Sequence, residues 1–280
     1  MHKKVALITG AASGIGKQFA HALIKKGSYQ VALTDINEEE LKEHFQPQDD
    51  VVLYKLDVRD VERWREVIAD VLARYNGLDY LFNIAGLVAP GFLLNTSTDD
   101  VDRIIDINTK GVIHGTRFGA EVMVKQGHGH IINVASLAGV TPVPGLSLYT
   151  ASKFAVRGFS LAEALTLREK GVAVTVICPD LVDTPMLDLQ LDYLEESALV
   201  FSGPKPLTVV DLEKAFFKAM QKKPLEMTLP PLRGVLSKIG SAFPSLLVLL
   251  AKPLSLKGQR SIKKFRQQRP DKWGKTGSSS

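Results

Sequence analysis

The sequence predicts an α/β fold, in which one doubly wound, mostly parallel sheet of about seven strands is covered by helices and followed by a helical C-terminal extension. Short β-branched runs alternate with longer helical patterns along the first 180 residues, which is typical of consecutive βαβ units. Most of these runs are apolar throughout, as expected for strands that are covered on both faces. The 280 residues, 45% of them hydrophobic and 23% charged, have the balance of an ordinary globular protein.

Six strands and the helices between them can be placed from this alternation. The strands are expected at residues 5–8, 30–34, 51–56, 78–83, 130–134 and 172–177. Helical patterns lie near residues 15–27, 60–75, 99–125, 150–170 and 208–222, the last with Thr208 as its N-cap. Residues 225–229 are a candidate for a seventh strand. Parallel strands joined by helices imply right-handed crossovers.

The positive charge of the chain is concentrated at its C-terminal end. The formal net charge is +5, but residues 251–280 hold nine basic residues and one acid, so residues 1–250 carry a net charge of −3. Nucleic-acid-binding domains usually present a basic face, so a nucleic-acid partner is not expected. Cys178 is the one cysteine and cannot form an internal disulfide. The sequence shows neither a signal peptide nor an apolar run that spans a bilayer, and we expect a cytoplasmic protein.

A glycine-rich turn follows the first expected strand. The sequence there is Thr9-Gly10-Ala11-Ala12-Ser13-Gly14-Ile15-Gly16, and a helical pattern comes directly after it. Glycines let the backbone approach a pyrophosphate closely, and a helix N-terminus offers free N–H groups to phosphates. The G-x-x-x-G-x-G spacing differs from the G-x-G-x-x-G of the standard dinucleotide fingerprint, but its position between a strand and a helix favours a dinucleotide site.

An acidic residue, Asp35, ends the second expected strand. A carboxylate at this position can accept hydrogen bonds from the adenosine ribose hydroxyls, and it would repel a 2′-phosphate. Ser13, Ile36 and Asn37 offer no compensating positive charge. We therefore expect NAD rather than NADP as the cofactor.

Tyr149 and Lys153 share one face of an expected helix, because residues i and i+4 lie one turn apart. A lysine ammonium beside a phenol stabilises the phenolate and lowers the tyrosine pKa, so that the tyrosine can exchange a proton with a substrate oxygen. Ser136 lies 13 residues before Tyr149, directly after an expected strand. The carboxyl ends of parallel strands meet at one edge of the sheet, and one crevice is expected to collect the glycine turn, Asp35, Asp57, residues 83–86 and Ser136.

With these motifs in order, the chain resembles the classical branch of the short-chain dehydrogenase/reductase family. The matching positions are residues 9–16, Asp57, Val58, residues 83–86, Asn108, Ser136, Tyr149 and Lys153. The resemblance covers about residues 3–230. It implies a Rossmann-type, NAD-binding catalytic domain over residues 1–230, with a substrate lid at about residues 183–206. It also implies a homodimer or homotetramer formed through the helices near 99–125 and 150–170.

The resemblance assigns catalytic roles to four residues. Tyr149 would be the general acid in reduction and the general base in oxidation, and Ser136 would stabilise the substrate oxygen. Lys153 would lower the pKa of Tyr149 and hold the nicotinamide ribose. Asn108, at a helix irregularity, would hold a water that relays protons to Lys153. The cofactor-binding positions that the resemblance implies are Gly10, Ser13, Gly14, Ile15, Gly16, Asp35, Asp57, Val58, Asn83, Ala85, Gly86, Tyr149, Lys153, Pro179, Val182 and Thr184.

One position departs from the family pattern. Asp180 follows Pro179 where the family usually has glycine, whereas Thr184 keeps the place of the threonine that meets the nicotinamide carboxamide. Binding of the carboxamide is therefore still expected, and a charge at Asp180 can influence the choice of substrate.

The segments that the family uses for its substrate pocket are mostly apolar here. They contain Val140, Val143, Leu146, Leu148, Met186, Leu187, Leu189, Leu191, Tyr193, Leu194, Leu199, Val200 and Phe201. No Arg or Lys clamp for a carboxylate or phosphate is visible among them. The expected substrate is a lipophilic alcohol or its ketone or aldehyde; the alternative is that these side chains only pack a lid.

The last fifty residues, 231–280, form the predicted extension. Residues 232–250 place apolar side chains on one helical face, with a kink expected at Pro244, and a flexible basic tail follows whose end, 274–280, is expected to be disordered. Three interpretations stay open: a helix at a membrane surface, which would make the protein peripherally membrane-associated, a helix over the lid or a partner subunit, or a packed helix with a solvated tail.

Two further functions also stay open. A catalytically silent dinucleotide-binding regulatory protein would be expected to lack part of the catalytic set, which is complete here. An NADPH-dependent oxoacyl reductase of the same family is disfavoured by Asp35. No metal is predicted, because the pair His128 and His130 lacks a third ligand in the sequence.

Overall fold

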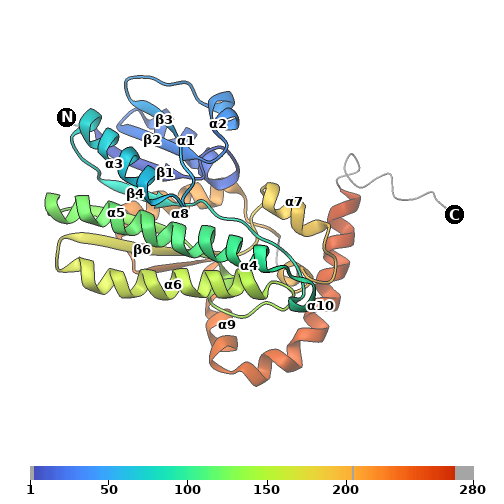
Figure 1. Cartoon of the computed structure of the whole chain (residues 1–280). Helices are drawn as coiled ribbons and strands as arrows, with labels where there is room; N and C mark the ends of the chain where they lie inside the picture. The colour runs from blue at the N-terminus through green and yellow to red at the C-terminus, as the bar shows by residue number, and fades with distance from the viewer. Residues whose placement is uncertain (1–2, 204, 269–280) are drawn as a thin grey trace.

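The computed structural model describes residues 3–203 and 205–268, and a parallel sheet runs through its centre (Figure 1). Its strands are β1 (Lys4–Thr9), β2 (Tyr29–Asp35), β3 (Val51–Lys55), β4 (Tyr80–Asn83), β5 (Gly129–Val134), β6 (Val172–Pro179) and β7 (Glu226–Leu229). They lie in the order β3-β2-β1-β4-β5-β6-β7, and every neighbouring pair is parallel. The predicted Rossmann-type α/β class and the seven strands are confirmed, and the sheet is parallel throughout.

The strand order reverses between β1 and β4. The chain moves outward from β1 to β2 and β3, then crosses back and adds β4 on the other side of β1. The connections after β1 and β4 therefore leave in opposite directions, which opens a crevice at the carboxyl ends of these strands.

The helices of the described chain lie on both faces of the sheet and beyond its carboxyl edge. They are α1 (Gly14–Lys26), α2 (Glu38–His44), α3 (Val61–Tyr75), α4 (Thr98–Ile105), α5 (Gly111–Gln126), α6 (Ser147–Arg168), α7 (Pro185–Leu191), α8 (Val209–Lys222), α9 (Pro231–Ala242) and α10 (Pro244–Gln267). The short helix α2 was not expected from the sequence. The N-cap of α8 is confirmed, since Thr208 Oγ1 accepts a hydrogen bond from Asp211 N at 3.2 Å.

Two apolar layers explain why the strands are apolar throughout. In β1, Val5 and Leu7 pack into the layer that contains α3 and α5, whereas Ala6 and Ile8 pack into the layer that contains α1 and α8. Phe19 of α1 lies at the centre of the second layer, with its ring centroid 4.6 Å from that of Phe82 on β4. Side chains alternate between the faces of a strand, so a sheet that is covered on both faces needs apolar residues at every position.

The helix expected over residues 99–125 is interrupted. A π-helical segment, Asp106–Lys110, separates α4 from α5 and contains Asn108. The extra residue of a π-turn shifts the helical register, and such turns are frequent at functional sites. The helix irregularity expected at Asn108 is therefore confirmed.

The C-terminal extension differs from its prediction in two ways. Pro244 begins a new helix, α10, instead of kinking one long helix, because proline is well accommodated in a first helical turn. Helix α10 then continues through Pro253 to Gln267, so the basic residues between Lys252 and Arg266 belong to a helix and not to a flexible tail. The predicted disordered end, 274–280, lies outside the described residues. Within residues 3–203 and 205–268, no helix has the length and apolarity needed to cross a membrane.

Candidate active site

A cavity of about 940 Å³ lies at the carboxyl edge of the sheet, where the strand order reverses. It extends from the glycine turn after β1 to the C-terminal helices α9 and α10. Most of the predicted site residues line it: Gly10, Ser13, Gly14, Ile15, Gly16, Asp35, Asp57, Val58, Ala85, Gly86, Ser136, Tyr149, Lys153, Pro179, Val182 and Thr184. The topology thus brings together motifs that are spread over 175 residues of sequence.

The glycine turn is packed so closely that Gly10 and Gly16 leave no room for a side chain. Gly10 has φ +71°, and a Cβ there would lie 2.8 Å from Ala85 Cα. A Cβ at Gly16 would lie 2.0 Å from Gly10 O. Ser13 precedes α1 without using its side chain as a cap. The bare backbone and the first N–H groups of α1 therefore face the cavity, which fits the pyrophosphate of a dinucleotide.

The carboxylate of Asp35 is held beside the glycine turn. Its Oδ2 accepts a hydrogen bond from Ala12 N at 2.9 Å, and its Oδ1 accepts one from Asn37 N at 3.0 Å. The next residue, Ile36, also lines the cavity and is 54% exposed. This corner of the cavity therefore presents a fixed negative charge and an apolar side chain.

Asp57 and Val58 form the adjoining wall, after β3. Arg59 Nη2 lies 2.6 Å from Asp57 Oδ2, and its hydrogen bonds hold the pKa of the Asp57 carboxyl below its usual range. Val58 is buried, and its carbonyl accepts a hydrogen bond from the Trp64 indole at 3.0 Å. The pairing of Asp57 with Arg59 was not part of the sequence prediction.

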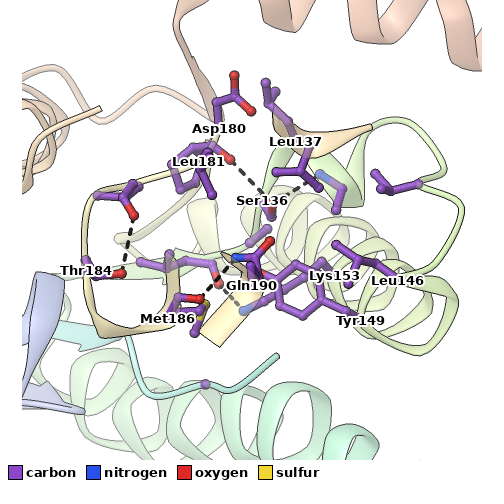
Figure 2. Close-up of a pocket in the computed structure, with 18 of the residues that line it drawn as sticks. Ser136, Leu137, Leu146, Tyr149, Lys153, Asp180, Leu181, Thr184, Met186 and Gln190 are labelled. Carbon is purple, nitrogen blue, oxygen red and sulfur yellow. Dashed lines mark hydrogen bonds between the residues drawn. The ribbon is translucent and has the colours of Figure 1, made fainter. Parts of the chain in front are cut away.

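Ser136, Tyr149 and Lys153 gather in the middle of the cavity (Figure 2). Ser136 follows β5, where its Oγ accepts a hydrogen bond from Ala138 N at 3.1 Å and donates one to Pro179 O at 3.4 Å. Tyr149 lies in the first turn of α6 and Lys153 one turn later, with Nζ 5.7 Å from the centroid of the tyrosine ring. Lys153 Nζ also donates to Val134 O at 3.0 Å, which fixes the ammonium against the end of β5.

Burial controls the protonation of this group. It raises the pKa of Tyr149 to about 12, and the hydrogen bond with Ser136 acts in the opposite direction. It lowers the pKa of Lys153 to about 8. Both shifts follow from the loss of hydration of the charged form. In the protein alone, the pKa of Tyr149 is therefore displaced upward, opposite to the direction expected from Lys153.

Asn108 lies behind the cavity and does not line it. Its Oδ1 accepts a hydrogen bond from Leu87 N at 2.8 Å, while Nδ2 donates to Leu87 O at 2.9 Å and to Ser152 Oγ at 3.1 Å. A Cβ at Gly86 would lie 3.1 Å from Asn108 Oδ1 and 3.4 Å from Lys153 Nζ. Asn108 thus fixes the loop after β4 directly behind the lysine.

The prediction that Asn83 lines the cofactor site is wrong for its side chain. Asn83 is buried at the end of β4, where Nδ2 donates to Asn133 Oδ1 at 2.8 Å and to Thr116 Oγ1 at 3.3 Å. The side chain points to the α5 face of the sheet, because it follows Leu81 with the two-residue period of a strand. Asn83 therefore belongs to a buried polar network behind the cavity.

The substrate end of the cavity is mostly apolar, but its walls differ from those expected. Of the expected residues, Val143, Leu146, Met186, Leu199 and Val200 line it. Leu187, Leu191 and Phe201 instead form a buried cluster with Ile262 of α10, so they pack the lid. Helices α9 and α10 supply a wall that the sequence did not assign: Leu232, Leu236, Ile239, Leu246, Leu247, Leu250 and Leu254. In Figure 2, Thr184 and Met186 lie on one side of Ser136, and Leu137 and Leu146 on the other.

The same end carries charged side chains that sequence reasoning missed. Arg233 of α9 lies with Nε 2.9 Å from Asp180 Oδ2, and both side chains line the cavity together with Lys257 of α10. Burial raises the pKa of Asp180, and the nearby Arg233 charge lowers it. The segments considered in the sequence contain no Arg or Lys clamp, but α9 and α10, which were not counted as pocket walls, add Arg233 and Lys257 to the lining.

Comparison with known proteins agrees with this geometry. A model of the short chain dehydrogenase family matches residues 4–192. The 15-hydroxyprostaglandin dehydrogenase (NAD+) of Mus musculus is 41% identical over 197 residues, which are 66% of this chain and 70% of that protein. A 3-oxoacyl-acyl-carrier-protein reductase of Thermotoga maritima is 36% identical over 200 residues, which are 70% of this chain and 81% of that protein. The solved structure of a short chain dehydrogenase/reductase from Burkholderia phymatum in complex with NAD has a TM-score of 0.77 and 27% identity, and covers 87% of this chain and 95% of that one. The chain therefore belongs to the short-chain dehydrogenase/reductase family of oxidoreductases.

Proposed function

We propose that this protein is an NAD(H)-dependent oxidoreductase that interconverts a lipophilic alcohol and its ketone or aldehyde. The observation that carries the proposal is the position of Ser136, Tyr149 and Lys153 in the middle of one cavity. On one side of them lie the glycine turn and Asp35, and on the other side lies an apolar wall. A dinucleotide and an apolar substrate can therefore meet at the tyrosine hydroxyl.

The cofactor would lie along the side of the cavity formed by the predicted binding residues. The turn from Gly10 to Gly16 would hold the pyrophosphate, Asp35 the adenosine ribose, and Asp57 with Val58 the adenine. Lys153 would hold the nicotinamide ribose and Thr184 the carboxamide. When bound, the nicotinamide supplies or accepts the hydride, and the protein supplies position and proton transfer.

Tyr149 is suited to give a proton to a substrate oxygen. A phenol with a pKa of about 12 is protonated at neutral pH, so it is ready as the general acid of the reduction. In the oxidation the phenol must act as the base, and positive charge beside it lowers its pKa toward the working pH. The Lys153 ammonium supplies part of that charge. Ser136 would donate a hydrogen bond to the same oxygen and stabilise its developing charge.

NAD is favoured over NADP by the corner at Asp35. A 2′-phosphate would stand beside a carboxylate that two backbone N–H groups hold in place. The neighbouring cation Lys17 is turned to His44, with Nζ 3.2 Å from His44 Nε2. The relative from Mus musculus is named for NAD+, which supports the same choice.

The apolar wall favours a lipophilic substrate. Leu146, Met186 and Val200 meet the leucines of α9 and α10 around the catalytic group. The name of the Mus musculus relative refers to a hydroxyprostaglandin, which is a lipid-derived alcohol. Helix α10 lies beyond residues 4–192, the part of this chain that the family model matches, so the name of the relative bears on the catalytic end of the cavity and not on this wall.

The test is a screen of the purified full chain with hydrophobic secondary alcohols and ketones, in which NADH absorbance is followed and NADPH serves as the comparison. We expect turnover of several apolar compounds with a preference for NAD(H). Binding of NADH without turnover of any compound would instead favour the silent regulatory protein. A preference for NADPH with an oxoacyl thioester would favour the oxoacyl reductase.

We also propose that the protein assembles as a homodimer or homotetramer through the surfaces of α4, α5 and α6. The resemblance to the family implies association through these helices, and Leu165 of α6 is an exposed apolar residue on that surface. Light scattering of the full chain would measure the mass, and a monomer at micromolar concentration would contradict the proposal.

A further inference from the structure

Helices α9 and α10 lie at the lower right of Figure 1. They carry a series of exposed apolar side chains. On α9 and in the turn after it these are Leu232, Val235, Leu236, Ile239 and Phe243; on α10 they are Leu246, Val248, Leu249, Leu250 and Leu256. We call this set the α9–α10 face. An apolar surface of this extent on a folded protein marks an interaction site.

The α9–α10 face is held in place from both ends. In α9, a Cβ at Gly234 would lie 1.9 Å from Thr228 Oγ1 of β7, so this helix touches the sheet edge. In α10, a Cβ at Gly258 would lie 1.6 Å from Ala198 O, and Ile262 is fully buried. Arg266 donates to Leu191 O. These contacts anchor both helices to the rest of the molecule. The apolar side chains that lie between the contacts are exposed to solvent.

The outward stripe of α10 changes from apolar to cationic along the helix. It consists of exposed residues spaced by three or four positions: Val248, Leu249, Lys252, Leu256, Arg260, Lys263 and Lys264. The basic residues of this stripe are Lys252, Arg260, Lys263 and Lys264. Among the described residues, none of these four has a carboxylate within 4 Å of its side-chain nitrogens. Residues 231–267 contain eight Lys and Arg and no Asp or Glu. The charged side chains that α9 and α10 themselves contribute are therefore all positive.

The positive charge of α10 distinguishes between two possible partners of the α9–α10 face, which are a second copy of this chain and a lipid bilayer. A second copy that met the face with its own α9–α10 face would bring cations against cations, which costs free energy. The headgroups of an anionic bilayer are negatively charged and attract the lysines and arginines of α10. The boundary between headgroups and acyl chains accommodates apolar side chains such as leucine. A helix with an apolar side and a lysine-rich border lies in the plane of the membrane interface.

We propose that the α9–α10 face binds the surface of an anionic phospholipid bilayer. Val248, Leu249 and the other apolar residues enter the interface, while Lys252, Arg260, Lys263 and Lys264 contact the headgroups. The cavity opens onto the same face, because Leu232, Leu236, Ile239, Leu246 and Leu250 are exposed and also line it. A lipophilic substrate dissolved in the bilayer therefore reaches Tyr149 between α9 and α10; this second statement rests on the proposed function.

The test of docking is flotation of the full chain with vesicles of phosphatidylcholine mixed with phosphatidylglycerol, compared with phosphatidylcholine alone. No cofactor or substrate is present, so the outcome is independent of the enzymatic proposal. We expect the protein to float with the anionic vesicles and to dissociate as salt is added. The double variant Val248→Ser/Leu249→Ser should bind at least ten-fold more weakly, on the order of the loss of one buried leucine. These two side chains are 77% and 74% exposed and do not line the cavity, so the fold and the pocket stay intact.

The matched apolar control is Val210→Ser/Leu225→Ser, which removes two other exposed apolar side chains, each 43% exposed, far from α10 in the sequence. The charge variant is Arg260→Gln/Lys263→Gln/Lys264→Gln, for which we expect roughly a hundred-fold weaker binding, at about five-fold per cation. Its control is Lys214→Gln/Lys218→Gln/Lys222→Gln, an exposed stripe of three lysines on α8.

Two results would overturn the proposal. The first is absence of flotation of the wild-type chain with anionic vesicles at low salt. The second is equal weakening of binding by the α10 variants and by their controls. A third outcome is that the wild-type chain fails to float and that Val248→Ser/Leu249→Ser lowers the oligomeric mass measured by light scattering. In that case a second copy covers the face, and the membrane proposal fails. The access statement is tested separately: with substrate supplied in vesicles, the α10 variants should lose rate while turnover of a water-soluble alcohol is unchanged.

Discussion

Arg233 Nε lies 2.9 Å from Asp180 Oδ2, and this ion pair joins the end of β6 to the first turn of α9. Asp180 occupies the position where relatives of the family usually have glycine. Its side chain is 11% exposed and that of Arg233 is 24% exposed, so the pair is largely shielded from water. The acid that departs from the family pattern is thus matched by a base that the C-terminal extension supplies.

The first prediction concerns the loss of this base. In Arg233→Met the Asp180 carboxylate stays buried without its partner, and the free energy of unfolding should fall by about 2 kcal/mol at neutral pH, less than for a fully buried pair. Burial already raises the pKa of Asp180, and the loss of the arginine raises it further. The loss of stability should therefore shrink as the pH falls and the carboxyl takes up a proton. Urea denaturation at several pH values measures this.

The control for this prediction is the pair of variants Asp180→Gly and Asp180→Gly/Arg233→Met. Removing both partners should restore most of the stability that Arg233→Met loses, because no buried charge is left unpaired. Gly203→Ala offers a second approach, since a Cβ at Gly203 would lie 1.4 Å from Arg233 Nη1 and would displace the guanidinium. If Arg233→Met and the double variant are equally unstable, the contact is packing and not an ion pair.

The part of the cavity lined by the glycine turn, Tyr149 and Lys153 could be predicted from the sequence because its signals are local. The turn from Gly10 to Gly16 directly follows a strand, and Tyr149 and Lys153 are one helical turn apart. The end of the cavity near α9 and α10 could not be predicted in this way. Asp180 and Arg233 are 53 positions apart, and no local sequence pattern around either residue indicates that the two will be in contact. The same holds for the leucines of α9 and α10, whose amphipathic pattern is equally compatible with three different surroundings.

Two errors have physical causes of a different kind. The motif around Asn83 is at the expected strand end, but its side chain faces α5 because the two-residue period of β4 sets its direction. The helix α2 carried a usable signal that was overlooked, since Asn37 precedes three glutamates and its side chain caps Glu40 N. Helix α10 passes through Pro253, although proline usually ends a helix, so local propensity alone could not give its length.

The second prediction tests the proton donor. Tyr149→Phe should lower kcat by roughly a hundred- to ten-thousand-fold, the usual contribution of a positioned general acid. Binding of NADH, followed by its fluorescence, should persist because the cavity keeps its shape. Tyr193→Phe is the matched control, since Tyr193 lies in the lid segment and is exposed. Turnover of the Tyr149 variant at the wild-type rate would contradict the assigned mechanism.

The third prediction tests the cofactor preference. Asp35→Ala removes the carboxylate that would face a 2′-phosphate, and the ratio of kcat/KM with NADP to that with NAD should rise roughly ten- to a hundred-fold. Asp35→Asn is the informative companion, because its amide oxygen can still accept a hydrogen bond from Ala12 N or Asn37 N. A ratio that stays constant in both variants would mean that Asp35 does not select the cofactor.

The fourth prediction concerns the cost of holding Lys153 in the site. Lys153 is 4% exposed, and burial lowers its pKa to about 8. Below that pH the ammonium is charged in both the folded and the unfolded chain, and the folded state carries the full burial penalty. Between about pH 8 and the ordinary lysine pKa near 10.5 the folded state is neutral while the unfolded state is still charged, so the stability of the wild-type protein should rise with pH.

Lys153→Met removes this penalty and should therefore be inactive yet more stable than the wild type. At neutral pH the gain in the free energy of unfolding should be about 2 kcal/mol, because a penalty of about 3 kcal/mol is relieved and the hydrogen bond to Val134 O is lost. The difference between variant and wild type should vanish or change sign near pH 10.5, where the wild-type lysine is neutral when folded. Urea denaturation without cofactor at neutral and alkaline pH measures both values. A variant that is less stable than the wild type at neutral pH would contradict the prediction. It would show that the Lys153 ammonium stabilises the fold and that its burial carries no net free-energy penalty.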